Sequence, residues 1–194
     1  MLGINPISKM LFLCAALFLP ALIHAHDGKG QLTPQDYIDI RELIEAYPNI
    51  LDTCAKGGYG YADQYTPTGT FGVSSAWGDD GHVWFRGREE LAVAAGGGTK
   101  GCLKTSNKYH HLALSPVIKA TPTGAHAIST LLMITDGSGD KGSKAEWQGG
   151  YEDTFVKTKD GWRFSSRRHV WPGYDWPATA ADMAERLAKQ RAND

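Results

Sequence analysis

Apolar residues recur at spacings of three and four in residues 33–56, and this spacing is typical of one buried face of an α-helix. The apolar positions are Tyr37, Ile40, Ile44, Tyr47, Leu51 and Cys54. The pattern predicts a helix that packs one side against a core. Asp52 falls on its last turn, next to the buried side.

Local chemistry predicts where this helix begins and ends. Thr33 and Asp36 have the spacing of a capping box, and Pro34 suits the first helical position. The Gly57-Gly58 pair is expected to end the helix. Pro48 lies inside the pattern, where its ring and its missing N–H are expected to kink the helix or split it.

The second half of the chain alternates apolar and polar residues, which is the period of a β-strand. Residues 57–73 are turn-rich, residues 82–87 predict a short strand, and residues 88–95 predict a short helix. Long strands follow, separated by turn sequences, in residues 108–120, 124–137, 144–158 and 161–173. Helices followed by an antiparallel meander indicate an α+β fold, with the N-terminal helices packed on one face of a curved antiparallel sheet.

Two adjacent histidines open the first long strand. Side chains alternate between the faces of a strand, so His110 shares a face with Leu112, and His111 shares the other face with Ala113 and Ser115. The inward histidine has three open roles: a catalyst, a metal ligand or a packing residue.

An apolar run follows Lys9 and ends in small residues at Ala25, which predicts a secretory signal peptide over residues 1–25. Pro20 interrupts the run, which is also short for a membrane span; a retained anchor is the alternative. We therefore expect residues 26–194 to form a single domain that is exported, periplasmic or secreted, and that has no membrane contact after cleavage.

Charge and cysteine content narrow the function classes. The formal net charge is −1 and no basic run is present, so nucleic acid is not an expected partner. Cys54 and Cys102 remain after cleavage of the leader; they can form a disulfide in an oxidising compartment, or stay reduced. The remaining histidines, His126 and His169 among them, show no metal-ligand spacing, so we expect chemistry without a metal or other cofactor.

Five segments occur in an order that resembles the SnoaL-like branch of the nuclear transport factor two-like superfamily. They are "AYPNILD", "YADQYTPTGTF", "FRGREEL", the histidine-led strand, and "GGYEDTFVKTKDGWRFSSRR". The resemblance implies a cone-shaped α+β barrel, in which a curved sheet wraps around helices and encloses an apolar pocket, in a homo-oligomer such as a dimer or trimer. It does not fix a reaction, because the superfamily contains dehydratases, isomerases, cyclases, epoxide hydrolases, lyases and non-enzymatic binding modules.

The resemblance also implies catalytic residues. Members similar to scytalone dehydratase and bile-acid dehydratase carry a tyrosine on the first helix, an aspartate five residues later and a histidine that opens a central strand, and Tyr47, Asp52 and His111 match. His111 is preferred to His110 because the family strand has a polar residue four places later, where this chain has Ser115. A carboxylate that binds one ring nitrogen fixes the tautomer and raises the basicity of the other, so Asp52 and His111 are expected to form an acid/base pair.

Further residues are expected to contact a substrate. The alternation of side chains along the last strand places Arg168 on one face with Trp162 and Phe164, and Arg167 on the other face with His169 and Trp171. One inward arginine would stabilise a developing oxyanion; an exposed basic edge is the alternative. The expected substrate contacts are Arg168, His110, Tyr151, His169, Tyr61 and Trp84.

These observations lead to a functional hypothesis. We expect a cofactor-independent lyase that acts on a hydrophobic aromatic small molecule by acid/base catalysis. Two reactions fit: elimination of water, and carbon–carbon cleavage that releases formaldehyde from lignin-derived diaryl propanoids. The competing hypothesis is a non-catalytic module of the same fold that binds a small molecule or serves oligomerisation.

Overall fold

A six-stranded, strongly curved sheet forms most of the protein in the computed structural model, which describes residues 30–103, 109–135 and 142–173 and four single positions nearer the C-terminus. The predicted signal peptide lies outside the described residues. The strands are β1 (Tyr65–Ser74), β2 (His82–Arg86), β3 (Tyr109–Thr121), β4 (Gly124–Thr135), β5 (Ala145–Thr158) and β6 (Gly161–Val170). Their order is β2-β1-β6-β5-β4-β3, so β2 and β3 are the two edges.

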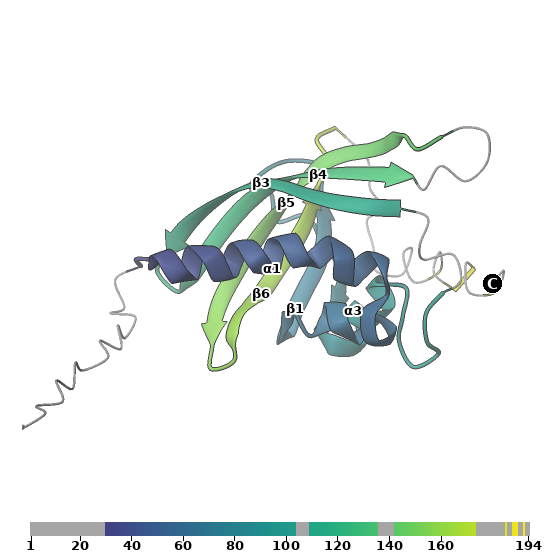
Figure 1. Ribbon diagram of the computed structural model, residues 1–194, viewed down its shortest axis with the longest axis horizontal. Helices are drawn as coiled ribbons and strands as arrows, with labels where there is room; N and C mark the ends of the chain where they lie inside the picture. The colour runs from purple at the N-terminus through teal and green to yellow at the C-terminus, as the bar shows by residue number, and fades with distance from the viewer. Residues whose placement is uncertain are drawn as a thin grey trace, which may run out of the picture.

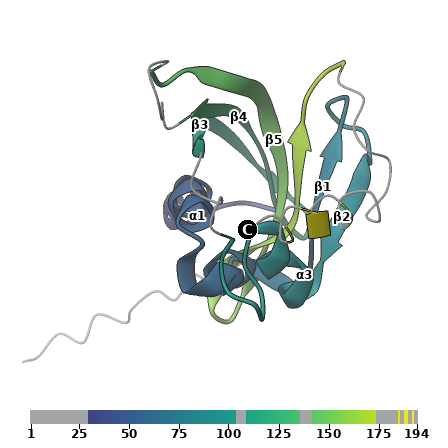
Figure 2. The same ribbon diagram turned by 90° about the vertical axis from the view of Figure 1, so that its right-hand side faces the viewer.

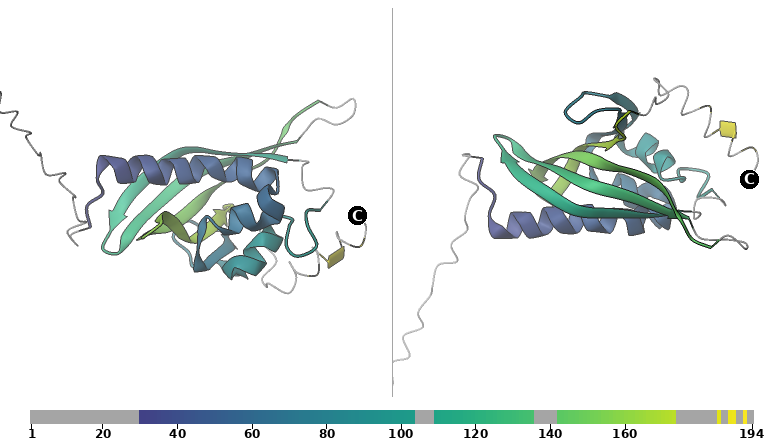
Figure 3. Two further views of the ribbon diagram at one scale, coloured as in Figure 1. Left: turned by 60° about the horizontal axis from the view of Figure 1, so that its bottom comes forward. Right: turned by 90° about the horizontal axis from the view of Figure 1, so that it is seen from above.

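The helices lie inside the concave face of this sheet (Figure 2). They are α1 (Pro34–Asp52), the short 3₁₀ turn η1 (Ala55–Gly58), α2 (Tyr59–Ala62) and α3 (Gly87–Ala94). α1 runs along the sheet and contacts β3 and β6, whereas α3 contacts β1 and β2 (Figures 1 and 3). The predicted α+β fold, a curved sheet around N-terminal helices, is confirmed. The described sheet is open between its two edges and is not a closed barrel.

The strand pairing corrects one prediction. Four strand pairs are antiparallel, but β1 and β6 are parallel, so the sheet is mixed. β1 occupies residues that the sequence predicts to be turn-rich, because Pro67, Gly69 and Gly72 are typical of turns. Gly72 is needed here, since a Cβ atom at this position would lie 2.2 Å from the carbonyl oxygen of His82 on β2.

The beginning of α1 confirms the predicted cap and connects it to the sheet. Thr33 Oγ1 accepts a hydrogen bond from the Asp36 N–H, and Asp36 Oδ2 accepts from the Thr33 N–H. Asp36 Oδ1 also accepts from Lys157 Nζ at 2.6 Å and from Trp162 Nε1 at 2.9 Å. Burial disfavours the charged form, but these hydrogen bonds outweigh it and hold the pKa of Asp36 well below its ordinary value.

The end of α1 differs from the prediction. The helix continues through Pro48 as one element and stops at Asp52, before the glycine pair. It stops there because Cys54 adopts a left-handed backbone conformation with φ of 47°, which a right-handed helix cannot contain. Ile40, Ile44 and Tyr47 are buried as predicted, whereas Tyr37 is exposed. None of the helices among the described residues is long and apolar enough to cross a membrane.

A bulge in β3 corrects the predicted position of Ser115. The pairing with β4 shifts between Leu114 and Val117, and Ser115 has a φ of 52° at this shift. Ser115 is therefore exposed and does not share the inner face with His111. Leu114 and Val117 are exposed on the outer face.

Candidate active site

Asp52 and His111 meet where the end of α1 crosses the beginning of β3. Asp52 Oδ2 accepts a hydrogen bond from the His111 backbone N–H at 2.8 Å, and Asp52 Oδ1 lies 2.5 Å from His111 Nδ1. The Asp52 and His111 side chains are 11% and 16% exposed, so neither is completely shielded from solvent. The predicted alternation holds at this end of the strand: His111 faces α1, and His110 is exposed on the other face.

This contact determines which ring nitrogen of His111 carries the proton. An ionised carboxylate can accept hydrogen bonds but not donate them, so neutral His111 carries its hydrogen on Nδ1. Nε2 then has a free lone pair and can accept a proton from another molecule. The arrangement is that of a general base oriented by a carboxylate.

Tyr47 lies five residues before Asp52 on α1 and faces the interior. Its hydroxyl is 3.1 Å from the hydroxyl of Tyr151 on β5, and its ring lies edge-on to the His111 imidazole with centroids 6.5 Å apart. Burial raises the pKa of Tyr47, although the nearby Arg167 charge opposes the shift. The hydroxyl therefore stays protonated at neutral pH and remains a hydrogen-bond donor.

Arg167 and Asp153 form a fully buried ion pair beneath these tyrosines. Arg167 Nε and Nη2 donate to the two carboxylate oxygens of Asp153, each at 2.8 Å, and both side chains are 0% exposed. The guanidinium carbon lies 3.9 Å from the ring centre of Tyr47 and 4.3 Å from that of Tyr151. Arg167 thus supports the tyrosine pair by cation–π contact and fixes its position.

Arg168 does not face inward, although it is a predicted substrate contact. It lies on the opposite face from Arg167, with Nη2 3.1 Å from Glu152 Oε2. The predicted alternation is broken because the pairing of β5 with β6 shifts between Thr154 and Phe155, which leaves Ser165 as an extra residue in β6. Phe164 and Arg167, three residues apart, therefore both face inward.

His169, a predicted substrate contact, faces the interior of the protein. It is buried, and its ring lies near those of Tyr151 and Trp171 at centroid distances of 5.7 and 6.1 Å. Burial and the proximity of His111 lower the pKa of His169 to about 4. His169 is therefore neutral at neutral pH.

Of the remaining predicted substrate contacts, Tyr61 lies beside Tyr47 and Trp84 lies far from the Asp52–His111 pair. Tyr61 is buried with its ring 5.4 Å from that of Tyr47, and its hydroxyl is 2.5 Å from that of Tyr65. Trp84 is buried on β2, at the opposite edge of the sheet from His111, and its ring packs near Phe71 at 6.4 Å. His110, Arg168 and Trp84 are thus not brought to the Asp52–His111 pair.

Three inward residues are missing from the predicted site. Arg167 and Asp153 form the buried pair, and Ser129 lies on β4 beside Tyr151 with its Oγ buried and without a hydrogen-bond partner in the described part of the chain. The sequence signal for Asp153 and Ser129 is weak, since a polar residue within a strand is more often exposed. No three His, Cys, Asp or Glu side chains converge on a potential metal site within residues 30–103, 109–135 and 142–173.

Comparison with known proteins reveals a family and a fold. A model of the SnoaL-like domain matches residues 33–168. No curated protein matches the chain.

Several solved structures share the fold. An NTF2-like protein with a cystatin-like fold from Novosphingobium aromaticivorans is 19% identical with a TM-score of 0.58, over 74% of this chain and 86% of the other. A protein from Catenulispora acidiphila in complex with S-DNPA is 19% identical with a TM-score of 0.52, over 71% and 95%. ActVI-ORFA from Streptomyces coelicolor is 17% identical with a TM-score of 0.53, over 71% and 95%.

Proposed function

The chain belongs to the SnoaL-like domain family, and from this premise we propose that it is a cofactor-independent lyase that acts on a hydrophobic aromatic small molecule. The family includes enzymes such as cyclases and ketosteroid isomerases. The observation that carries the proposal is the two-point contact between Asp52 and His111. A histidine fixed in this way has one nitrogen available for proton transfer, and it lies beside a cluster of tyrosines.

His111 Nε2 removes a proton from the substrate in the first step, and Asp52 stabilises the imidazolium that forms. Negative charge then develops on a substrate oxygen, or electrons pass into a quinone-methide-like system. The Tyr47 hydroxyl, protonated at neutral pH, donates a hydrogen bond to that oxygen. Arg167 does not touch the substrate in this scheme; it holds Tyr47 in place.

Two eliminations use this arrangement. In the loss of water, the proton leaves a carbon, the electron pair forms a carbon–carbon double bond, and the hydroxyl group, protonated by the His111 imidazolium, departs as water. In the release of formaldehyde from a lignin-derived diaryl propanoid, the phenol first loses its proton and the benzylic hydroxyl group leaves as water, which forms a quinone methide. The proton of the hydroxymethyl group is then removed and its carbon–carbon bond breaks as formaldehyde forms. The released electron pair makes a new carbon–carbon double bond and restores the phenolate. Rings of Tyr47, Tyr61, Tyr65 and Tyr151 on the inner face suit the aromatic substrate of either reaction.

The test is turnover by the purified protein. Phenolic diaryl propanoids that carry a hydroxymethyl group are incubated with the wild type and with Asp52→Asn, without added cofactor, and products are followed by mass spectrometry and a formaldehyde assay. Turnover by the wild type that is lost in Asp52→Asn supports the proposal. Binding of these compounds without turnover by either protein would instead favour the non-catalytic module, for which the tyrosine-lined inner face is equally suitable.

We also propose that the protein is exported and forms a homo-oligomer. The apolar run before residue 26 supports export. Leu112, Leu114, Val117 and Ile128 are exposed on the outer face of the neighbouring strands β3 and β4, where a second copy would cover them. Light scattering coupled to size-exclusion chromatography should show an oligomer that Leu114→Lys weakens. A monomeric wild type would contradict the oligomer.

A further inference from the structure

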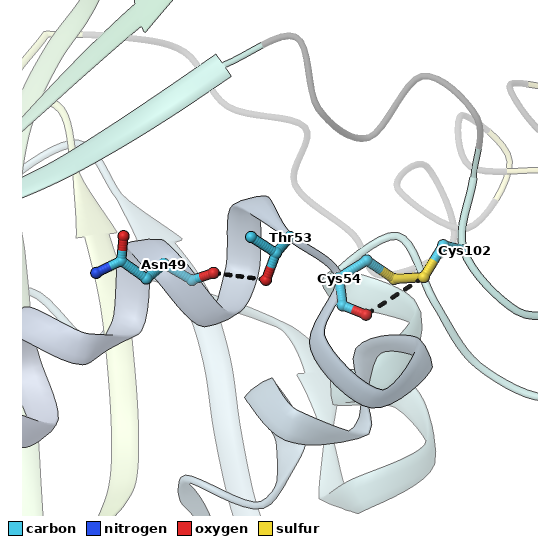
Figure 4. The surroundings of a disulfide bond; sticks show 4 residues. All are labelled: Asn49, Thr53, Cys54 and Cys102. Carbon is cyan, nitrogen blue, oxygen red and sulfur yellow. Dashed lines mark hydrogen bonds between the residues drawn. A yellow bond between two sulfur atoms is a disulfide. The ribbon is translucent and has the colours of Figure 1, made fainter.

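Asp52 occupies a position where a carboxylate is electrostatically unfavourable. It is the last residue of α1, and carbonyl groups at the C-terminal end of a helix repel negative charge. The last turn of α1 contains no basic residue to compensate. Thr53 donates a hydrogen bond from Oγ1 to the Asn49 carbonyl at 2.7 Å (Figure 4), and this bond does not involve the Asp52 carboxylate. The end of α1 therefore needs another restraint to hold Asp52 against His111.

A disulfide lies close to both residues of the pair. Cys54, two positions after Asp52, is bonded to Cys102, which lies nine positions before His111, with their Cα atoms 6.1 Å apart (Figure 4). Cys54 is 3% exposed and is the residue whose left-handed backbone ends the helix. The bond thus joins the end of α1 to the segment that follows α3.

The segment that carries Cys102 is itself anchored. The Gly98 N–H donates to the Gly57 carbonyl at 2.9 Å, and the Gly97 N–H donates to the Ala92 carbonyl at 2.9 Å. Gly97 also packs so closely on the turn η1 that a Cβ atom there would lie 2.1 Å from the Gly57 oxygen. The disulfide therefore connects the end of α1 to a segment that backbone contacts already fix to η1 and to the end of α3.

We propose that the Cys54–Cys102 disulfide is a positioning device for the Asp52–His111 pair. By limiting movement of the end of α1 relative to the end of α3, it keeps the Asp52 carboxylate within hydrogen-bond distance of both the backbone and the ring of His111. The inference rests on the proposed function for its catalytic consequence, but its structural content can be tested without a substrate.

The first test measures hydrogen exchange of the His111 amide, which donates to Asp52 Oδ2. Cys102→Ser is the main variant because the Cys102 side chain is exposed, and Cys54→Ser and the double variant break the same bond. The control amide is that of Phe164, a fully buried residue that donates to the Gln64 carbonyl away from the disulfide. We expect all three variants to exchange the His111 amide roughly tenfold faster or more, because the local opening that exposes it becomes easier.

A merely structural disulfide gives a different result. If the bond only stabilises the whole fold, unfolding of the whole protein becomes easier and the Phe164 amide should accelerate by at least as large a factor as the His111 amide. This outcome would overturn the inference. Because Cys54 is buried, its substitution can disturb packing; an effect confined to Cys54→Ser and absent from Cys102→Ser would overturn it as well.

The second test measures turnover of a substrate identified as described above. Loss of positioning should lower kcat while KM changes little, by up to about 10²-fold if the carboxylate moves by about 1 Å. An unchanged kcat in Cys102→Ser, with turnover still dependent on Asp52, would overturn the positioning role and leave the proposed function intact. Failure of the proposed function has a separate signature, since Asp52→Asn would then leave turnover unchanged whatever the exchange rate of the His111 amide.

Discussion

The Asp52 carboxylate holds His111 by its backbone and by its ring at the same time: Oδ2 accepts from the His111 N–H at 2.8 Å, while Oδ1 lies 2.5 Å from Nδ1. One contact fixes where the strand lies relative to α1, and the other fixes the orientation of the imidazole. A bond to the ring alone would leave the ring free to turn about the strand. The pair is therefore both a packing contact between two elements and a chemical unit.

If Asp52 and His111 act as one unit, removing either should abolish most of their shared contribution. His111→Ala and Asp52→Asn should each lower kcat by roughly 10²–10⁴-fold, and the double variant should lose little more than either single variant. His110→Ala is the matched control, because His110 is the neighbouring residue and its side chain is exposed on the other face. The measurement is kcat on any substrate that is turned over, with folding checked by circular dichroism. A slow His110→Ala and a fast His111→Ala would contradict the assignment.

The resemblance to the SnoaL-like family predicts this pair, and short-range patterns agree with its placement. Helical spacing places Tyr47 on the inner face and Asp52 at the end of α1, and alternation over a few residues separates His110 from His111. Alternation fails for the arginines, since the extra residue Ser165 lies between Phe164 and Arg167 and reverses their parity. A bulge depends on how a neighbouring strand pairs, which local sequence does not specify.

The same limit explains the strand that the sequence misses. β1 pairs in parallel with β6, which lies about a hundred residues later in the chain, and of its two glycines Gly72 is needed because β2 approaches closely. Those glycines have the local appearance of turn residues. What can be predicted here is the fold class, the helices and the longer strands. The parallel pairing and the inward ion pair of Asp153 and Arg167 depend on contacts distant in sequence.

The Tyr47 hydroxyl should contribute to rate as a hydrogen-bond donor. Burial raises its pKa, so it remains protonated over the neutral range. Tyr47→Phe removes the donor and keeps the ring on Arg167, so kcat should fall by roughly 10²–10³-fold. Because the buried Tyr151 hydroxyl loses its partner, the free energy of unfolding should fall by about 1–3 kcal/mol. Tyr59→Phe is the control, since the Tyr59 hydroxyl donates to Glu89 on the exposed side of the protein. Equal kcat values for the two variants would exclude Tyr47 from catalysis.

Neighbouring arginines on β6 should differ strongly in their effect on stability. Arg167→Met leaves Asp153 charged and buried without its partner, and should lower the free energy of unfolding by about 3–5 kcal/mol. Arg168→Met breaks a partly exposed pair with Glu152 and should lower it by about 1 kcal/mol or less. Urea unfolding of both variants gives the comparison.

A double variant separates the charge of Asp153 from the packing of Arg167. Asp153→Leu/Arg167→Met removes both charges, and should recover much of the stability lost in Arg167→Met. If it is no more stable than Arg167→Met, the contact of the guanidinium with the rings of Tyr47 and Tyr151, and not the unpaired carboxylate, accounts for the loss.

His169 should make the stability of the protein depend on pH below neutrality. Burial and the charge of His111 lower its pKa from 6.5 to about 4, whereas in the unfolded chain it should titrate near its ordinary value. Between these two values the unfolded state binds more protons than the folded state, so the free energy of unfolding rises with pH. The contribution is complete above about pH 6.5 and is lost as the pH falls toward 4, with a slope of at most about 1.4 kcal/mol per pH unit.

His169→Gln removes the titrating group, so urea unfolding across this range should show a shallower pH dependence than the wild type. His110→Gln, which replaces an exposed histidine, is the control and should keep the wild-type slope. A His169→Gln slope equal to that of the wild type would mean that His169 takes up its proton as readily in the folded protein as in the unfolded chain, and that it does not remain neutral beside His111 at mildly acidic pH.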